Sequence, residues 1–201
     1  MRVLGLSDIH NDIDYLKKLP FSSVDVVIMT GDIITYESYM NELKDFVSDA
    51  LFIPGNNDPI NFCSFYTCVN KKRVDIGRYN VVGLGFSLIT PFNTLNEMTE
   101  QQFQNELSQL KELVDKNTIF LTHNPPYGIF DYVNNLHLGS KSILSFVKNT
   151  KPRIHMFGHV HELKGFKQTD NTLFVKLPPP PYYTLIDVDN LLVTFHKLDY
   201  F

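Results

Sequence analysis

Short apolar runs alternate with amphipathic stretches along the first quarter of the chain. Each run has the continuous hydrophobicity of a buried strand and is followed by polar turn residues. The stretches after the first two runs place apolar residues at helical spacing, and Asp12 supplies an N-cap for the first of them. The predicted elements are strands at 3–6, 24–29 and 50–53 and helices at 13–19 and 39–47. This order is typical of an α/β fold.

A hairpin follows, and helices and strands then alternate again. Residues 74–76 and 79–84 flank a glycine turn and predict the hairpin. Thr99 and Gln102 have the spacing of a capping box, so the clearest helix begins there. The proline tract 178–181 should form a rigid connection. The other predicted elements are strands at 118–121 and 154–157, a helix from Ser140, and closing antiparallel strands near 166, 173–177, 183–188 and 191–195.

Composition and charge narrow the class of protein. The 201 residues, 43% of them hydrophobic, can build one packed core, so a single domain over 1–201 is predicted. The net charge of -4 offers no basic field for nucleic acid. No apolar stretch approaches the roughly 18 residues of a membrane span, and a soluble cytoplasmic protein without a membrane partner is expected. Cys63 and Cys68 are expected to be reduced intracellular thiols.

Polar side chains with metal-binding chemistry gather where the predicted strands end. Because the carboxyl ends of strands in an α/β sheet share one edge, residues far apart in the sequence can meet there. Carboxylate, amide and imidazole groups form a mixed ligand set for divalent transition metals. Taken singly, each residue could equally be a turn, a cap or a surface residue. The candidates are Asp8, His10, Asp32, Asn56, His123 and His159.

The pair His159 and His161 adds a spacing argument. In an extended chain, residues two positions apart place their side chains on one face about 7 Å apart. Metal–nitrogen bonds of about 2.1 Å and a metal pair roughly 3.5 to 4 Å apart fit this span if each imidazole binds a different ion. His155 and His196 are interpreted as structural, and His155 is expected to point away from the side of Phe157 and His159.

Taken in order, these motifs resemble a known family. They are Asp8-x-His10, Gly31-Asp32, Gly55-Asn56-x-Asp58, His123 and Gly158-His159-x-His161. Over residues 3–188 the chain resembles the calcineurin-like metallophosphoesterases. The segments 123–128 and 137–140, with Asp131, resemble a small bacterial and archaeal phosphoesterase branch of that superfamily. The resemblance implies a four-layer α/β/β/α sandwich of two facing mixed sheets flanked by helices.

The resemblance also implies a dinuclear centre of two divalent ions, with Mn, Fe, Zn, Ni or Co as the candidates. It places one ion on Asp8, His10 and His161, the other on Asn56, His123 and His159, and Asp32 between them. Two such ions would lower the pKa of a bound water toward ~7, and a hydroxide bridging them would attack the phosphorus. The predicted function is a metal-dependent phosphoesterase, either a phosphodiesterase or a phosphatase, acting on a small phosphoester.

Asn57 departs from the family pattern, because many relatives carry histidine there. An amide can donate a hydrogen bond to a phosphoryl oxygen but cannot supply a proton, which favours diesters or activated esters as substrates. Asp58 is predicted to assist catalysis by orienting a metal-bound histidine. His137 could contact the substrate or lead into the helix at Ser140, whose N-terminus could bind an anion.

Two other functions remain open from the sequence. One is a non-catalytic protein-interaction scaffold on the same fold, as in the retromer subunit that resembles these enzymes. The other is a nuclease, although the acidic chain shows no basic approach for a nucleic acid. The loops expected to select the substrate are 59–72, 86–98 and 127–139. The motifs carry no information on oligomeric state.

Overall fold

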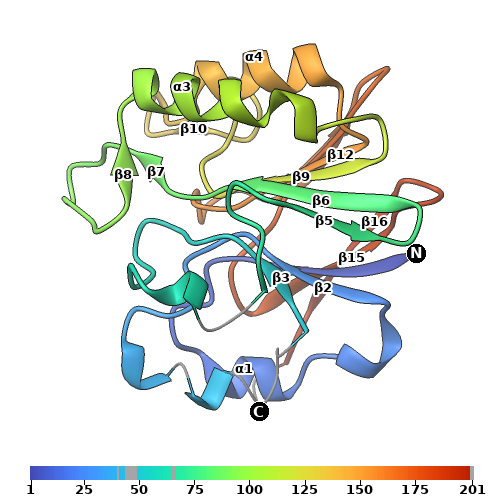
Figure 1. The fold of residues 1–201 in the computed structure, drawn as a ribbon. Coiled ribbons are helices and arrows are strands. Elements are labelled where there is room, and N and C mark those ends of the chain that lie inside the picture. Colours follow the sequence, from blue (N-terminus) through green and yellow to red (C-terminus); the bar gives the residue numbers. More distant parts are fainter. Residues whose placement is uncertain (40, 44–48, 65–66, 200–201) are drawn as a thin grey trace.

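The structure, a computed structural model, describes residues 1–39, 41–43, 49–64 and 67–199. Two six-stranded sheets face each other, and helices cover their outer faces (Figure 1). Most of the helix predicted at 39–47 lies outside the described residues. In the described part of the chain, no helix is both long and apolar enough to cross a membrane.

The first sheet is built around the amino-terminal strand. Its six strands are β1 (Arg2–Leu6), β2 (Val26–Met29), β3 (Leu51–Phe52), β4 (Thr67–Cys68), β15 (Tyr182–Asp187) and β16 (Leu192–Lys197). The order across the sheet is β16-β15-β1-β2-β3-β4. Strands β1 to β4 run parallel to one another, whereas β15 and β16 are antiparallel to their neighbours.

The second sheet has the same mixed character. Its strands are β5 (Arg73–Ile76), β6 (Tyr79–Leu84), β9 (Thr118–Thr122), β12 (Ile154–Phe157), β13 (Gly165–Gln168) and β14 (Leu173–Lys176). The order is β13-β14-β12-β9-β6-β5. The predicted hairpin is confirmed as the antiparallel pair β5–β6. The predicted closing antiparallel strands are confirmed as the pairs β13–β14 and β15–β16, and β14 also runs parallel to β12 on its other side.

Polar caps define where the helices begin. Within the described residues, the α-helices are α1 (Ile13–Lys17), α3 (Glu100–Leu110) and α4 (Lys141–Thr150), and residues 41–43 are also helical. The 3-10 helices of this part of the chain are Phe21–Ser23, Glu37–Tyr39, Phe62–Ser64 and Lys111–Leu113. Asp12 caps α1, and Thr99 forms the predicted capping box with Gln102 at the start of α3. Ser140 caps α4, where its Oγ accepts the N–H of Ile143 at 3.1 Å.

Two short strand pairs lie outside the main sheets. They are β7 (Ser87–Leu88) with β8 (Glu97–Met98), and β10 (Tyr132–Val133) with β11 (Leu136–His137). Both belong to loops that were expected to select the substrate. They give these loops a defined backbone path.

Three layers of buried apolar side chains separate the four layers of secondary structure. Ile28 and Ile119 belong to the layer between the two sheets. Phe103 and Phe146 fill the layer between the second sheet and the helices α3 and α4. Leu16 lies in the layer between the first sheet and α1. The predicted α/β/β/α sandwich is therefore confirmed (Figure 1).

The proline tract 178–181 carries the chain from β14 in the second sheet to β15 in the first.

The state of the two cysteines contradicts the sequence prediction. Cys63 and Cys68 were expected to be reduced thiols, but the structure joins them in a disulfide. The 3-10 helix at 62–64 and strand β4 bring their Cα atoms to 5.0 Å, within the range that a disulfide spans.

Candidate metal centre

Five loops meet at one edge of the sandwich. Each follows the carboxyl end of a strand: β1, β2 and β3 in the first sheet and β9 and β12 in the second. The structure brings the seven predicted ligands together there, as the shared-edge argument predicts. They are Asp8, His10, Asp32, Asn56, His123, His159 and His161.

Several of these residues have a left-handed backbone. The φ angles are 55° at Asp8, 48° at His10, 53° at Asp32 and 72° at His159. Such angles cost of order 1 kcal/mol or more at a residue with a side chain, and they concentrate at functional sites. Backbone hydrogen bonds of 3.0 Å hold two of these residues in place. The Asp8 N–H donates to the Gly31 carbonyl, and the His10 N–H donates to the Asp32 carbonyl.

Two glycines let the loops after β2 and β3 approach each other. A Cβ atom on Gly55 would lie 2.1 Å from Asp32 Oδ1. Gly31 has a φ of 98°, and a Cβ atom there would lie 2.5 Å from the Gly55 nitrogen. Any side chain at either position would push the loop after β3 away from Asp32.

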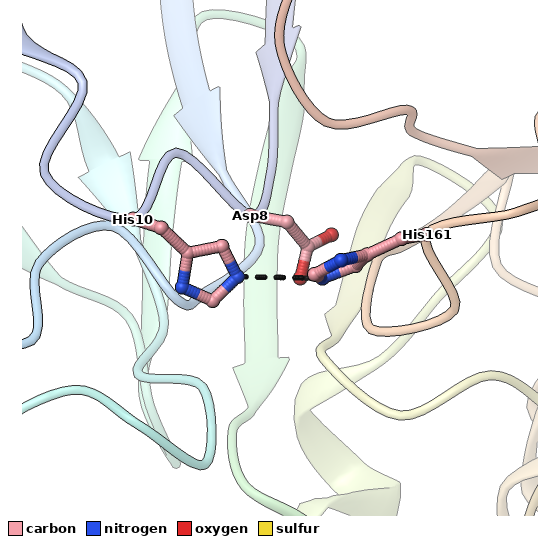
Figure 2. A group of neighbouring side chains, drawn as sticks. All are labelled: Asp8, His10 and His161. Carbon is pink, nitrogen blue, oxygen red and sulfur yellow. Dashed lines mark hydrogen bonds and ion pairs between the residues drawn. The ribbon is translucent and has the colours of Figure 1, made fainter.

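Asp8, His10 and His161 form the first compact group. His161 Nε2 lies 3.4 Å from Asp8 Oδ1 and 3.3 Å from His10 Nε2. Figure 2 shows Asp8 and His10, both on the loop after β1, together with His161 on the loop after β12. Asp8 is buried, whereas both histidines reach the surface. One carboxylate oxygen and two imidazole nitrogens at this spacing fit a divalent ion.

His123 is the centre of the second group and is fully buried. Its Nε2 lies 3.0 Å from Asn56 Oδ1, 3.6 Å from Asp32 Oδ2 and 4.0 Å from Asp8 Oδ1. Its Nδ1 donates to the Thr30 carbonyl oxygen at 2.7 Å. This bond fixes the ring and directs Nε2 toward the ligand oxygens, as is usual for metal-binding histidines.

Asp32 reaches both groups. Its Oδ2 lies 3.6 Å from His123 Nε2 and 4.0 Å from His10 Nε2. A carboxylate in this position can bridge two ions, as the family resemblance implies.

The segment of His159 and His161 is not extended, so that prediction is wrong. Strand β12 ends at Phe157, and the left-handed angle at His159 turns the chain. The turn is held by the His159 N–H, which donates to Asp8 Oδ2 at 3.0 Å. The two imidazoles therefore separate: His159 lies 5.0 Å from His123 between ring centroids, and His161 lies 5.1 Å from His10.

The charges of the site shift the pKa of its members. Burial opposes the ionisation of Asp8, but the hydrogen bond with His161 and the charge of His123 hold its pKa well below the usual range. Burial also lowers the pKa of His123, whereas the charge of Asp32 and its hydrogen bond raise it, to about 9. Burial and the charge of His123 lower the pKa of His159 to about 4. A divalent ion would compete with the His123 proton.

Asn57 is bonded to the candidate bridging carboxylate. Its backbone N–H donates to Asp32 Oδ1 at 2.8 Å, and its side-chain Nδ2 donates to Asp32 Oδ2 at 2.6 Å. The amide therefore orients Asp32 from the edge of the centre. A contact with substrate stays a prediction for Asn57.

Asp58 does not orient a histidine, and the prediction of that catalytic role is wrong. Its fully buried carboxylate accepts four backbone N–H groups at 2.6 to 3.0 Å, from Asp32, Ile33, Ile34 and Gly55. Both carboxylate oxygens of Asp58 are therefore occupied by backbone donors, and neither is directed at an imidazole. Asp58 instead fastens the loop after β2 to the loop after β3.

His137 is held by a carboxylate and two aromatic rings. Its Nδ1 lies 2.9 Å from Asp131 Oδ1, and buried Asp131 also accepts the Gly139 N–H at 3.1 Å. The His137 ring lies 4.5 Å from that of Tyr127 and 4.8 Å from that of Tyr132, between centroids. The nitrogen available to a substrate is therefore Nε2.

A cleft of about 680 Å³ joins His137 to the metal centre. The same cleft is lined by His10, Asp32, Asn56, Asn57, His159 and His161. His137 thus faces the space in which a substrate would lie. Its contact with the substrate stays a prediction, and this placement is compatible with it.

The start of helix α4 does not offer an anion site, contrary to the sequence prediction. The carboxylate of Glu100 accepts the Ser142 N–H at 2.6 Å and the Ser140 hydroxyl at 2.8 Å. The Glu100 carboxylate therefore already occupies the position at the helix N-terminus where an anion would bind. Glu100 lies forty positions before Ser140, so no local pattern predicts this contact.

Two further buried polar residues near the centre escaped the sequence prediction. Asn124 links two walls of the cleft: its Oδ1 accepts the Leu88 N–H at 3.0 Å, and its Nδ2 lies 3.4 Å from the Leu138 carbonyl. Lys176 is fully buried, and burial lowers its pKa to about 8, although the charge of Asp8 favours the charged form. The only sequence signal was a lysine inside an otherwise apolar strand.

His155 and His196 lie outside the centre, as predicted. His196 stacks on Tyr183, with ring centroids 5.0 Å apart. His155 is fully buried, and its Nε2 lies 2.9 Å from Thr122 Oγ1. It does not point away from Phe157, because alternate strand residues share a face and the two ring centroids are 5.1 Å apart.

The burial of His155 predicts a loss of stability in acid. Burial lowers its pKa from 6.5 to about 3. Below pH 6.5 the unfolded chain binds a proton that the folded chain does not, so the free energy of unfolding should fall by ~1.4 kcal/mol per pH unit until about pH 3. The free energy of unfolding can be measured by denaturant unfolding at pH 7 and at pH 5. Between these two pH values it should fall by about 2 kcal/mol less for His155→Phe than for wild type. His196→Phe should keep the wild-type slope, and equal slopes for all three would contradict the prediction.

Comparison with known proteins identifies the family. The profile of the calcineurin-like phosphoesterases matches residues 1–163. The chain belongs to the calcineurin-like phosphoesterase family. The chain is 31% identical over 209 residues to the uncharacterized protein MJ1162 of Methanocaldococcus jannaschii, covering 96% of this chain and 95% of that protein. It is 29% identical to the UPF0046 protein K07C11.7 of Caenorhabditis elegans, covering 60% of this chain but only 40% of that longer protein.

Solved structures share the fold of this chain. The protein TT1561 of Thermus thermophilus superposes with a TM-score of 0.72 at 18% identity, covering 98% of each chain. A dimetal phosphatase from Danio rerio gives a TM-score of 0.64 at 12% identity, with 92% of this chain and 91% of that chain covered. The family resemblance seen in the motifs, including its small archaeal and bacterial branch, is confirmed.

Proposed function

We propose that this protein hydrolyses a small phosphomonoester or phosphodiester with the help of two divalent ions. The observation that supports it is the division of the candidate ligands into two groups on either side of Asp32. One group is Asp8, His10 and His161, and the other is Asn56, His123 and His159. Manganese, iron, zinc, nickel and cobalt all accept these donors.

The side chains of the centre suit an anionic substrate. When bound, two divalent ions supply an activated water and neutralise charge on the phosphoryl oxygens. Asp8 and Asp32 together carry only two negative charges, so the loaded site attracts phosphate. The Thr30 carbonyl orients His123, and Asn57 orients Asp32.

His137 supplies the proton that Asn57 cannot. Asp131 holds the His137 ring by Nδ1, which leaves Nε2 for the leaving-group oxygen of an ester in the cleft. A positioned histidine with a carboxylate behind it has the composition of a general acid. In this proposal His137 takes over the role that a histidine in the third motif has in many relatives.

The first experiment is hydrolysis of p-nitrophenyl phosphate and bis-p-nitrophenyl phosphate by metal-stripped protein. Adding back Mn, Zn, Ni or Mg should restore turnover, and His159→Ala should abolish it without unfolding the protein. The preferred ester then indicates the substrate class. Full activity of His159→Ala, or turnover that no added metal changes, would contradict the proposal.

The alternatives have less support from the cleft. A nuclease needs a basic approach for the phosphate backbone, and none of the residues described as lining the cleft is a lysine or arginine. A non-catalytic scaffold function does not explain why the candidate metal ligands form two groups. It would gain support if purified protein bound metal poorly and hydrolysed neither ester.

A further inference from the structure

The outer walls of the cleft are apolar. Ile89 and Phe92 lie on the loop between β7 and β8 and are 66% and 80% exposed. Leu136 lies on β11 and Leu138 directly follows that strand, and Leu136 is 63% exposed. Large apolar side chains on both walls of a cleft that leads to polar ligands are typical of a site for an amphipathic small molecule.

Hydrogen bonds fix both walls, so the apolar side chains are displayed on ordered backbone. Glu97 Oε1 accepts the Thr90 hydroxyl at 2.6 Å and the Thr94 N–H at 3.0 Å, closing the loop that carries Phe92. The opposite wall is held by the Leu138 N–H, which donates to the Asp131 carbonyl at 2.9 Å. Preorganised walls reduce the entropy cost of binding an apolar group.

The charges of the cleft limit the substrate to a single phosphoryl group. Its described lining contains the carboxylates of Asp32 and Glu162 but no lysine or arginine. Additional phosphates would therefore find no lysine or arginine in the described lining to neutralise their charge, and Glu162 would repel them. A polyphosphate or an oligonucleotide is poorly matched to this surface.

We infer that the substrate carries an uncharged, apolar organic group, aryl or alkyl, on a single phosphoryl group. The phosphoryl group lies at the metal centre, and the organic group packs between Phe92 and Leu136. This inference rests on the proposed hydrolase function and names its substrate class.

The test varies the organic group while the leaving group stays constant. Methyl, hexyl and phenyl p-nitrophenyl phosphates all release p-nitrophenolate, and the p-nitrophenyl ester of thymidine 5′-phosphate presents a polar arm of similar reach. With metal-loaded wild type, kcat/KM for the phenyl and hexyl esters should exceed that for the methyl ester by roughly tenfold or more. The thymidine ester should show no such gain.

Matched variants assign the preference to the cleft. Phe92→Ser and Leu136→Ser should each reduce the phenyl-to-methyl ratio severalfold. Phe166→Ser is the control, because Phe166 is a 51% exposed phenylalanine on β13 that does not line the cleft. The control should keep both the ratio and the basal activity.

A binding measurement separates this inference from the hydrolase proposal. Calorimetry with metal-loaded protein should give tighter binding of phenylphosphonate than of methylphosphonate, and Phe92→Ser should remove the difference. Tighter phenylphosphonate binding without any turnover would support the apolar subsite and overturn the hydrolase. Turnover with no dependence on the arm, or a preference for the thymidine arm, would overturn the subsite and retain the hydrolase.

Two remaining results would also overturn the inference. One is the absence of both turnover and phosphonate binding, which removes the proposed function as well. The other is a wild-type dimer in sedimentation velocity that Phe92→Ser dissociates, because the apolar walls would then serve contact between two copies of the chain.

Discussion

Asp32→Asn is expected to lower kcat/KM for p-nitrophenyl esters by more than ~100-fold, since losing only an outer partner of a metal ligand already costs about 10- to 100-fold. The Asp32 carboxylate lies within 4.0 Å of a histidine from each group, His10 and His123. Asparagine keeps the shape but removes the charge and one acceptor oxygen. Steady-state kinetics and metal content by mass spectrometry should therefore both change.

The control is Asp14→Asn, which removes an 81% exposed carboxylate on α1 whose partner is the surface residue Lys17. It should keep wild-type activity and metal content. Both variants should unfold cooperatively, because asparagine at position 32 can still accept the Asn57 N–H. Unchanged activity in Asp32→Asn would rule out a bridging role for this residue.

His137→Gln is also expected to have a large effect, and the effect should depend on the leaving group. For esters of poorly acidic alcohols and phenols, loss of a general acid should lower kcat/KM by ~10² to 10⁴. For p-nitrophenyl esters the effect should be small, because p-nitrophenolate leaves without a proton. A plot of log kcat/KM against leaving-group pKa should be shallow for wild type and steep for the variant.

Two further variants separate proton donation from packing. Asp131→Asn should steepen the plot partly, because Asp131 is a positioning residue that acts through His137 Nδ1. His196→Gln, which changes a histidine stacked on Tyr183 outside the centre, should leave the slope unchanged. Parallel lines for wild type and His137→Gln would show that His137 binds the ester without donating a proton.

The sequence predicts much of the fold because buried strands and capped helices are local patterns. The capping box at Thr99 and the hairpin at 74–84 need only neighbouring residues, and both are confirmed. The meeting of the candidate ligands follows from a general rule, since loops at the carboxyl ends of strands share one edge. Their grouping in space could therefore be predicted without any contact being visible.

The incorrect predictions for Asp58, for His159 and for the start of α4 concern contacts that local patterns do not encode, whereas the error at His155 concerns simple strand alternation. Asp58 was assigned to a histidine, but its partners are backbone groups on two loops. The turn at His159 depends on a hydrogen bond to Asp8, 151 positions away. Glu100 reaches the start of α4 across forty residues. Each of these contacts forms only when the sheets and helices are assembled.

The four hydrogen bonds of Asp58 have a consequence for how such a centre can change over evolution. Because they end on backbone groups, they do not depend on which side chains the loops carry. A ligand can then be exchanged while the paths of both loops persist. The metal preference of this fold can therefore drift one residue at a time, without passing through a protein that has lost its structure.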